Sequence, residues 1–438
     1  MIQSSNFSEL NRQFARLEIE TVSGRICRLG ESLVDVEGLA RLLKIGDRVR
    51  LETKAGRSVG AEVVALNSEK ASVFPESRTE GLAIGDRAIY CGQSSIAPDP
   101  SWVGHTLDAF GNAMDGTRLR DGDRSYPLRA SPPNAMDRKP LGGRLETGLA
   151  VLNTFLPIAR GQRIGVFAGS GVGKTTLLGK LAKTVSADVV VLVLIGERGR
   201  EVRDFVEKIL GPDAMTRCVV VAATSDQSPA IKRRALFSAM SIAECLRDAG
   251  AHVLFIADSL TRFAEAHREV ASACGEVTSM RGFPPSTSSL LMELVERAGP
   301  GEHDAGDITA VFSVLVAGSD LEEPISDITR GILDGHIILS REIAARGRFP
   351  AIDVLQSVSR SLPDAASTGE NEILYQARTL LSAYERSRLM IESGLYTQGS
   401  NSEIDKACQV NEELERFLSR VESISIVESF QRLYKVIQ

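Results

Sequence analysis

The stretch "FAGSGVGKTTLL", residues 167–178, decides the fold of this chain. It follows the phosphate-loop pattern, except that Ala168 stands where the pattern has its first glycine. The glycines nearest the phosphates remain, namely Gly169, Gly171 and Gly173. Because glycine has no side chain, backbone N–H groups can turn inward around phosphate oxygens. The apolar run "RIGVFAG" before the loop indicates a strand, and "TTLLGKLAKTV" after it indicates a helix. The sequence therefore predicts a strand–loop–helix unit that binds phosphate.

Two residues at the end of this loop have the chemistry for a metal-bound nucleotide. Lys174 places a cation on the β- and γ-phosphate oxygens, and the Thr175 hydroxyl is suited to ligate Mg²⁺. The helix that follows offers the positive end of its dipole to the anion. The other residues predicted to contact the nucleotide are Ala168, Gly169, Ser170, Gly171, Val172, Gly173 and Thr176. The sequence thus predicts that ATP and Mg²⁺ bind here.

Apolar runs alternate with helical stretches from about residue 161 to residue 350. The runs are "RIGVFAG", "DVVVLVLIG", "RCVVVAAT", "HVLFIADS" and "DITAVFSVLVAG". Near-continuous hydrophobic strands of this kind are typical of a parallel sheet that is buried on both faces. Their alternation with helices predicts a doubly wound α/β domain.

Carboxylates follow two of these runs. Asp258 ends "HVLFIADS", where it either caps the next helix or holds a Mg²⁺-bound water, and beside a phosphate loop the second role is favoured. "LVLIGERGREVRDF" concentrates five charges after another strand: Glu197, Arg198, Arg200, Glu201 and Arg203. Alone, that run is best interpreted as a solvated helix start. At the carboxyl ends of parallel strands, however, it faces the ligand crevice, where a carboxylate can orient an attacking water.

The rest of the chain predicts three further parts around this domain. Short β-rich runs with Gly–Asp turns, including the repeated "IGDR", indicate a small β-barrel over residues 19–95. Residues 96–360 are expected to form the nucleotide-binding α/β domain, with a Pro/Gly-rich connector at its start, and residues 361–438 are helical by period. Residues 1–18 carry an amphipathic helix whose stripe either packs on its own chain or docks a partner. That stripe is Phe7, Leu10, Phe14 and Leu17.

Composition excludes several classes of protein. The net charge of −6 does not suggest a dedicated nucleic-acid binder, and no run is long enough for a membrane span of about 20 residues. The six cysteines are far apart with no C-x-x-C pair, which argues against a disulfide framework or a zinc site. We therefore expect a cytoplasmic protein.

Several spaced motifs together resemble a known family. They are "AGSGVGKT", "GERGREV", "FIADSLTRFA", "ERAG", "EPISDITRGILDGHIILSR" and "FPAIDVLQSVSR". This set resembles the catalytic subunits of the F-type and V-type rotary ATPases. Within that family it is most similar to the flagellar protein-export ATPases and their type III secretion relatives. The resemblance covers roughly residues 20–430 and is strongest over 140–362. It implies a P-loop RecA-like core between the barrel and the C-terminal helices.

The resemblance also implies a role for each matching residue. The catalytic set is Lys174, Glu197, which positions water, Arg198, Arg262, which points to the γ-phosphate, and Arg360. The metal set is Thr175, with Glu201 and Asp258 acting through Mg²⁺-bound water, and Phe349 stacks on the adenine. On the residues alone Arg360 would be a surface cation, whereas the resemblance makes it an arginine finger that a neighbouring subunit supplies.

The family further implies an assembly and its partners. We expect a homohexameric ring with ATP hydrolysed at subunit interfaces to promote export of flagellar proteins. The expected partners are a negative regulator or stator at the N-terminal helix, a central stalk, export chaperone–substrate complexes and, through partners, a membrane export gate. The ring would then lie in the cytoplasm, peripheral to the inner membrane.

Three alternatives remain open from the sequence. Virulence secretion ATPases share these motifs. A rotary ATP synthase subunit would usually carry "GGAGVGKT" and an acidic C-terminal segment, which this chain lacks. A ring-shaped RNA translocase would need a basic, aromatic barrel, and residues 20–95 offer few such side chains.

Overall fold

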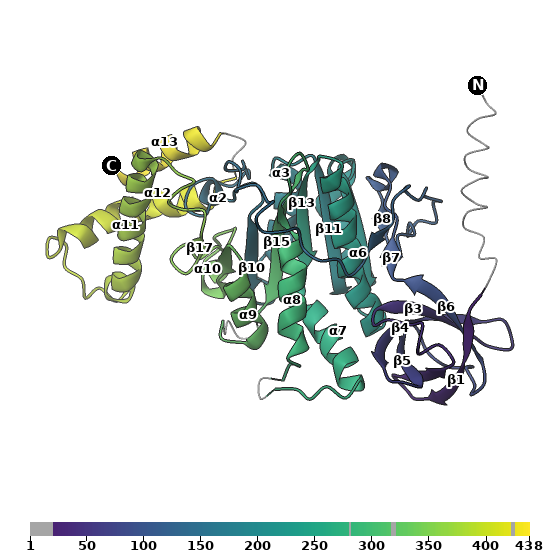
Figure 1. Ribbon diagram of the computed structural model, residues 1–438. Helices are drawn as coiled ribbons and strands as arrows, with labels where there is room; N and C mark the ends of the chain where they lie inside the picture. Colours follow the sequence, from purple (N-terminus) through teal and green to yellow (C-terminus); the bar gives the residue numbers. More distant parts are fainter. Residues whose placement is uncertain (1–20, 280–281, 317–320, 422–424) are drawn as a thin grey trace, which may run out of the picture. The chain divides into compact units, whose positions relative to one another are not determined.

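The computed structural model describes residues 21–279, 282–316, 321–421 and 425–438 (Figure 1). The helix predicted near the N-terminus, residues 1–18, lies outside these ranges. The chain divides into two compact units. One ends at Ser94 and includes Ala273–Glu276, and the other comprises Ser95–Ser272 and Val277–Gln438.

The first unit contains a closed β-barrel, as the sequence predicts, with strand order β1-β2-β5-β4-β3-β6. Its strands are β1 Ser23–Leu29, β2 Val34–Glu37, β3 Asp47–Glu52, β4 Ser58–Leu66, β5 Lys70–Pro75 and β6 Arg87–Gln93. The two "IGDR" repeats form the same turn. Asp47 and Asp86 are each buried, and each accepts a backbone N–H at 2.8 Å from the residue three positions earlier. These turns start β3 and β6 and so help to set the register of the barrel.

The second unit is built on a largely parallel sheet with the order β17-β16-β10-β15-β13-β11-β12-β8, to which β14 adds beside β15. The strands are β8 Thr106–Leu107, β10 Arg163–Ala168, β11 Val189–Glu197, β12 Cys218–Thr224, β13 His252–Asp258, β14 Gly299–Pro300, β15 Asp307–Leu315, β16 Gly335–Leu339 and β17 Val358–Ser359. Strand β14 pairs antiparallel to β15 and β17 pairs antiparallel to β16, whereas the other strand pairs described in this sheet are parallel. The carboxyl ends of β10, β11 and β13 consequently share one edge, which is where a doubly wound sheet binds its ligand.

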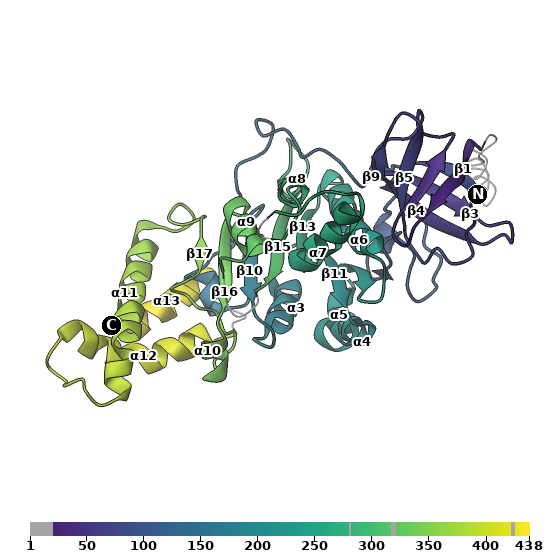
Figure 2. The same ribbon diagram turned by 90° about the horizontal axis from the view of Figure 1, so that it is seen from below.

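Helices cover both faces of this sheet (Figure 2). Along β11, Val191, Val193 and Ile195 pack with α6, α7 and α8, while the alternate residues pack with α3 on the opposite face. The helices of this region are α2 Ala150–Asn153, α3 Lys174–Thr184, α4 Gly199–Asp204, the π-helix η2 Phe205–Leu210, α5 Gly211–Met215, α6 Pro229–Asp248, α7 Leu260–Ala273, α8 Ser286–Arg297, α9 Pro324–Ile332 and α10 Arg341–Ala345. Burial on both faces explains the continuous apolar runs of the strands.

The region predicted as a connector contributes to the core. Strand β8 pairs in parallel with β12 at the edge of the sheet, and β7 Ser95–Ile96 pairs with β9 Tyr126–Pro127. The short 3-10 helix η1 Pro100–Trp102 buries the indole ring of Trp102, whose Nε1 donates to the Arg120 carbonyl at 2.6 Å. This segment is therefore an integral part of the second unit.

Three helices end the chain, as the helical period predicts: α11 Thr368–Glu392, α12 Ser402–Leu418 and α13 Ile426–Ile437. Ser367 and Ser425 cap α11 and α13 in capping boxes, and Asn401 caps α12. Their apolar faces join one hydrophobic core with α2 and α3. No helix among the described residues has the length and apolar character that crossing a membrane requires.

Candidate nucleotide-binding and hydrolysis site

The phosphate loop lies between the end of β10 at Ala168 and the start of α3 at Lys174. Gly171 and Gly173 have φ values of 77° and 90°, which other residues rarely adopt, so the loop conformation requires glycine at both positions. Ser170, Gly171, Thr175 and Thr176 are exposed, whereas Ala168 and Val172 are buried and anchor the loop. The loop is thus held on the sheet with its polar atoms open to a ligand.

Asp258 ends β13 and lies directly beside this loop. Its side chain is buried, its Oδ1 accepts a hydrogen bond from Ser313 Oγ at 2.7 Å, and the same oxygen pairs with Lys174 Nζ. Ser313 is a polar residue in the middle of the apolar strand β15. The structure therefore brings Lys174 and Asp258 together, and it adds Ser313, which sequence analysis missed. The signal was the single serine in "DITAVFSVL".

A backbone irregularity at the end of β11 positions Glu197. The pairing of β11 with β12 shifts register between Ile195 and Glu197, at Gly196, whose φ is 72°. A side chain at Gly196 would lie 3.3 Å from the Arg262 side chain, so the two residues pack closely. A bulge of this kind re-aims the side chain that follows it. Gly196 is a second residue that sequence analysis missed, and a glycine within a strand signal pointed to it.

The surroundings of Glu197 raise its pKa to about 7. Burial is the main cause, followed by the negative charge of Asp258 and a hydrogen bond with the Glu201 side chain, while Lys174 opposes the shift. A carboxylate with a pKa in this range is suited to accept a proton near neutral pH. This pKa makes Glu197 the candidate for a water-orienting base.

The residues after Glu197 form the start of α4. Glu201 Oε2 accepts the Arg198 backbone N–H at 3.2 Å, which, with the hydrogen bond to Glu197, lowers the pKa of Glu201. The Arg198 side chain is exposed. Arg262 is held by Glu265 through an ion pair of 2.9 Å, with its side chain 46% exposed. The structure therefore gathers both arginines near Glu197 with guanidinium groups that remain accessible.

Phe349 also lies beside the phosphate loop of its own chain. Its ring is half exposed, and a side chain placed on Gly173 would lie 3.4 Å from Phe349 Cδ1. An exposed aromatic ring next to a phosphate loop offers a flat surface to a base.

Arg360 lies near the amino ends of β10 and β16, whereas the phosphate loop follows the carboxyl end of β10. Arg360 follows β17, whose residue Ser359 pairs with Gly335 at the start of β16, and its backbone N–H donates to the Asp334 carbonyl at 3.0 Å. Asp334 in turn contacts Arg163, the first residue of β10. From Arg163 to the loop at Ala168 the strand covers about 16 Å at roughly 3.3 Å per residue. Arg360 therefore does not reach the phosphate loop of its own chain.

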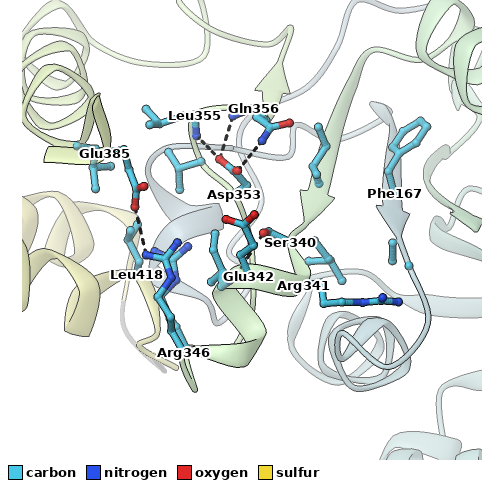
Figure 3. Close-up of a pocket in the computed structure, with 18 of the residues that line it drawn as sticks. Phe167, Ser340, Arg341, Glu342, Arg346, Asp353, Leu355, Gln356, Glu385 and Leu418 are labelled. Atoms are coloured by element: carbon cyan, nitrogen blue, oxygen red, sulfur yellow. Dashed lines mark hydrogen bonds and ion pairs between the residues drawn. The ribbon is translucent and has the colours of Figure 1, made fainter. Parts of the chain in front are cut away.

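A cavity of about 480 Å³ borders the start of the phosphate loop at Ala168 and Gly169 (Figure 3). Its other walls come from α10 and the strand before it, and from α11 and α12. Two ion pairs line it, Arg346–Glu385 at 3.3 Å and Arg348–Glu415 at 3.0 Å. The lining excludes Lys174, Glu197 and Asp258, so this cavity adjoins the loop without containing the candidate catalytic groups.

Two protein-family models match the chain. Residues 148–359 match the ATP synthase alpha/beta family, nucleotide-binding domain, and residues 366–435 match the T3SS EscN ATPase C-terminal domain. The first match ends with β17, and the second begins just before α11.

Curated relatives are similar over almost the whole chain. A "Flagellum-specific ATP synthase" of Caulobacter vibrioides is 42% identical over 97% of both chains. The protein of the same name from Salmonella typhimurium is 41% identical over 91% of this chain and 89% of its own length. A "Type 3 secretion system ATPase" of Xanthomonas euvesicatoria is 39% identical over 94% of this chain and 92% of its own.

Solved structures show the same architecture. The assembled ATPase EscN from the type III secretion system of enteropathogenic E. coli has a TM-score of 0.88 and 35% identity, over 95% of this chain and 100% of that chain. EscN in complex with its central stalk EscO has a TM-score of 0.85 at the same identity and coverage.

Proposed function

We propose that this chain, which belongs to the family of the flagellum-specific ATP synthases and type III secretion ATPases, powers a flagellar protein-export apparatus as its ATP hydrolase. One observation carries the enzymatic part of the proposal. Glu197, with a pKa of about 7, lies at the sheet edge that also carries the phosphate loop and the Lys174–Asp258 pair.

We propose one role for each residue in and around the phosphate loop. The ammonium group of Lys174, paired with Asp258 in the free protein, turns to the β- and γ-phosphate oxygens of ATP. Glu197 orients a water in line with the γ-phosphate and accepts its proton. Arg198 and Arg262, both accessible, contribute positive charge where the γ-phosphate lies, and Phe349 stacks on the adenine.

The residues beside the loop fit Mg²⁺. They offer the Thr175 hydroxyl, the buried Asp258 carboxylate and the exposed Glu201 carboxylate, all of them oxygen donors. Mg²⁺ keeps several waters and takes few protein ligands, so Thr175 would bind it directly, and Asp258 and Glu201 would hold its waters. The bound ion neutralises phosphate charge.

A ring of identical copies is the assembly that completes the site. Arg360 cannot reach its own phosphate loop, so its role as an arginine finger requires a second copy that presents Arg360 to the first. The similarity to assembled EscN supports this arrangement, and we propose a homohexamer with one site at each contact. Because each site needs two chains, activity depends on protein concentration.

The proposed ring also implies partner proteins. The similarity to EscN bound to its central stalk EscO supports a stalk protein at the centre of the ring. We also propose that a negative regulator docks at residues 1–18, that export chaperone–substrate complexes are engaged, and that partners bring the ring to a membrane export gate. The ring then works in the cytoplasm against the inner membrane. The similarity to EscN keeps a virulence secretion system as the second candidate.

Steady-state Mg-ATP hydrolysis across a wide range of protein concentration tests the enzymatic proposal. Specific activity is expected to rise with concentration, and the Glu197→Gln and Arg360→Ala variants are each expected to be inactive. Mixing the two variants should restore turnover, because some contacts then pair an intact Glu197 with an intact Arg360. Activity that is flat with concentration and indifferent to Arg360 would contradict the shared site.

Expression in cells tests the biological part. In a flagellated bacterium that lacks its own export ATPase, the wild-type chain is expected to restore secretion of filament protein, and the Glu197→Gln variant is not. Restoration of an injectisome but not of a flagellum would favour the virulence alternative.

A further inference from the structure

Every second residue of the segment that carries Arg360 is a buried serine that anchors the segment to the protein interior. In "SVSRS", residues 357–361, Ser357, Ser359 and Ser361 are buried, while Val358 and Arg360 are exposed. Ser359 Oγ donates to the Pro157 carbonyl at 2.6 Å and Ser361 Oγ donates to the same carbonyl at 3.3 Å. This alternation has the period of an extended strand. It directs the Arg360 side chain to the protein surface, where its Nη2 donates to the Arg330 carbonyl at 3.4 Å.

The backbone of Arg360 depends on Asp334. The Asp334 carbonyl accepts the Arg360 N–H at 3.0 Å and the Gln162 side-chain amide at 2.9 Å. Next to Asp334, Gly335 has a φ of 145°, and a side chain there would lie 2.5 Å from the Val358 carbonyl. The close approach of β17 to β16 therefore requires glycine at position 335. Because the Arg360 N–H binds the Asp334 carbonyl, a shift of Asp334 would also shift Arg360.

The Asp334 carboxylate in turn binds Arg163, the first residue of β10. Its Oδ2 accepts the Arg163 backbone N–H and the Arg163 Nε, both at 3.0 Å, and its Oδ1 accepts Arg163 Nη2 at 3.2 Å. Arg163 also pairs with Glu296 at 2.6 Å, and its side chain is only 16% exposed. Two parallel charge-assisted bonds in a half-buried setting fix orientation as well as distance. The other end of the same strand is the phosphate loop.

We propose that Asp334 is a positioning residue for the arginine finger, because its bidentate pair with Arg163 holds the turn from which Arg360 reaches the site of a neighbouring copy. The inference rests on the proposed function, in which Arg360 acts on the next subunit. Each chain then contributes to two sites, its phosphate loop to one and Arg360 to that of the neighbour. Strand β10 connects the two contributions, because the loop follows one end of the strand and Asp334 is bound at the other. Asp334 affects turnover at the neighbour's site and not at its own.

The test begins with Asp334→Asn, which keeps the carbonyl contacts and removes the charge that binds Arg163. We expect kcat to fall roughly ten- to a hundredfold, as for a misplaced catalytic group, with KM for ATP almost unchanged. Arg163→Lys, which keeps the charge but loses the fork, should show the same pattern more weakly.

Mixing experiments separate this role from a structural one. Asp334→Asn chains mixed with Glu197→Gln chains form contacts at which an intact Glu197 meets a properly held Arg360, so activity should rise above the sum of the separate proteins. Glu76→Gln is the matched control, because it breaks the bidentate Arg48–Glu76 pair at 2.8 Å in the barrel, which belongs to the other compact unit of the chain. It should lower the midpoint of thermal denaturation comparably and leave kcat unchanged.

The outcomes distinguish the two proposals. Unchanged kcat in Asp334→Asn, or a fall in kcat that mixing does not relieve, overturns the role of Asp334 even while Arg360→Ala remains inactive and is complemented by Glu197→Gln. An active Arg360→Ala variant overturns the shared site itself, and the positioning role with it.

Discussion

The Lys174 ammonium group pairs with the Asp258 carboxylate, and the oxygen that it contacts also accepts a hydrogen bond from Ser313 Oγ. Before ATP binds, the cation of the phosphate loop is therefore held by the strand β13 that carries the predicted metal-site carboxylate. This pairing avoids leaving either buried charge alone. Under the proposed function, nucleotide phosphates would compete for Lys174 and would leave Asp258 available to hold the waters of Mg²⁺.

Substitution of Asp258 is expected to uncouple Mg²⁺ from nucleotide binding. In Asp258→Asn, Mg-ATP hydrolysis should fall by roughly a hundredfold or more, because a neutral amide holds the waters of the ion poorly. Calorimetric titration with ADP, with and without Mg²⁺, measures the coupling directly. Ser313→Ala, which removes only one hydrogen bond, is expected to reduce activity much less. If Mg²⁺ raises the ADP affinity of Asp258→Asn as much as that of the wild type, the metal-site role of Asp258 is contradicted.

The pH dependence of the reaction should report Glu197. Because burial and the Asp258 charge raise the pKa of Glu197 to about 7, kcat/KM for ATP is expected to rise with pH through that value and then level off. The Glu197→Gln variant should lose this rise. A wild-type profile that is flat across neutral pH would exclude Glu197 as the base in the free enzyme.

The same shift predicts an effect on stability with the opposite sign. Between the ordinary value of 4.5 and about 7, the folded chain holds a proton on Glu197 that the unfolded chain has lost. The contribution of Glu197 to the free energy of unfolding is therefore present at low pH and is lost as pH rises through that window. Urea denaturation of Glu197→Gln should show a weaker fall in stability over that pH range than the wild type. An identical pH dependence in the two proteins would contradict the shift.

Two glycines provide a matched test of the bulge before Glu197. Gly196 and Gly211 have φ values of 72° and 73°, but only a side chain at Gly196 would meet Arg262, whereas one at Gly211 would meet nothing within 4 Å. Replacing either glycine by alanine is expected to lower the free energy of unfolding by about 1–3 kcal/mol because of the backbone conformation. Only Gly196→Ala should also lower kcat, by about tenfold or more, since it displaces Arg262 and re-aims Glu197. Equal kcat values for the two variants would refute the role of the bulge.

The buried pair of Arg297 and Glu244 should matter for stability and not for chemistry. Its Nη2–Oε2 distance is 2.6 Å, and the two residues are 2% and 5% exposed. Glu244→Ala leaves the Arg297 charge uncompensated, so the free energy of unfolding is expected to fall by about 3–5 kcal/mol. The exposed pair of Arg416 and Glu412 is the control, because Glu412→Ala should cost about 0–1 kcal/mol. Urea denaturation measures both, and similar losses would show that burial is not the deciding factor.

Local pattern was sufficient to predict the three-part fold. Glycine spacing in "AGSGVGKT", continuous apolar runs and a helical period depend only on neighbours along the chain, so the phosphate loop, the parallel sheet and the C-terminal helices could all be predicted. The small strands β8, β16 and β17 could not, because each is stabilised by pairing with a strand distant in sequence. The connector was therefore underestimated as a part of the core.

The sequence by itself determined which groups the chain places at the ends of its strands: the loop with Lys174, then Glu197 and Asp258, each directly after an apolar run. Tertiary structure alone decided how they act. Burial and the charge of Asp258 raise the pKa of Glu197, and the register shift at Gly196 lies directly before that residue. The antiparallel return of β17 puts Arg360 at the far end of the sheet from its own loop. These properties depend on charges and strands that are far apart in the sequence and adjacent in the fold. The spacing of residues along the sequence therefore does not predict them.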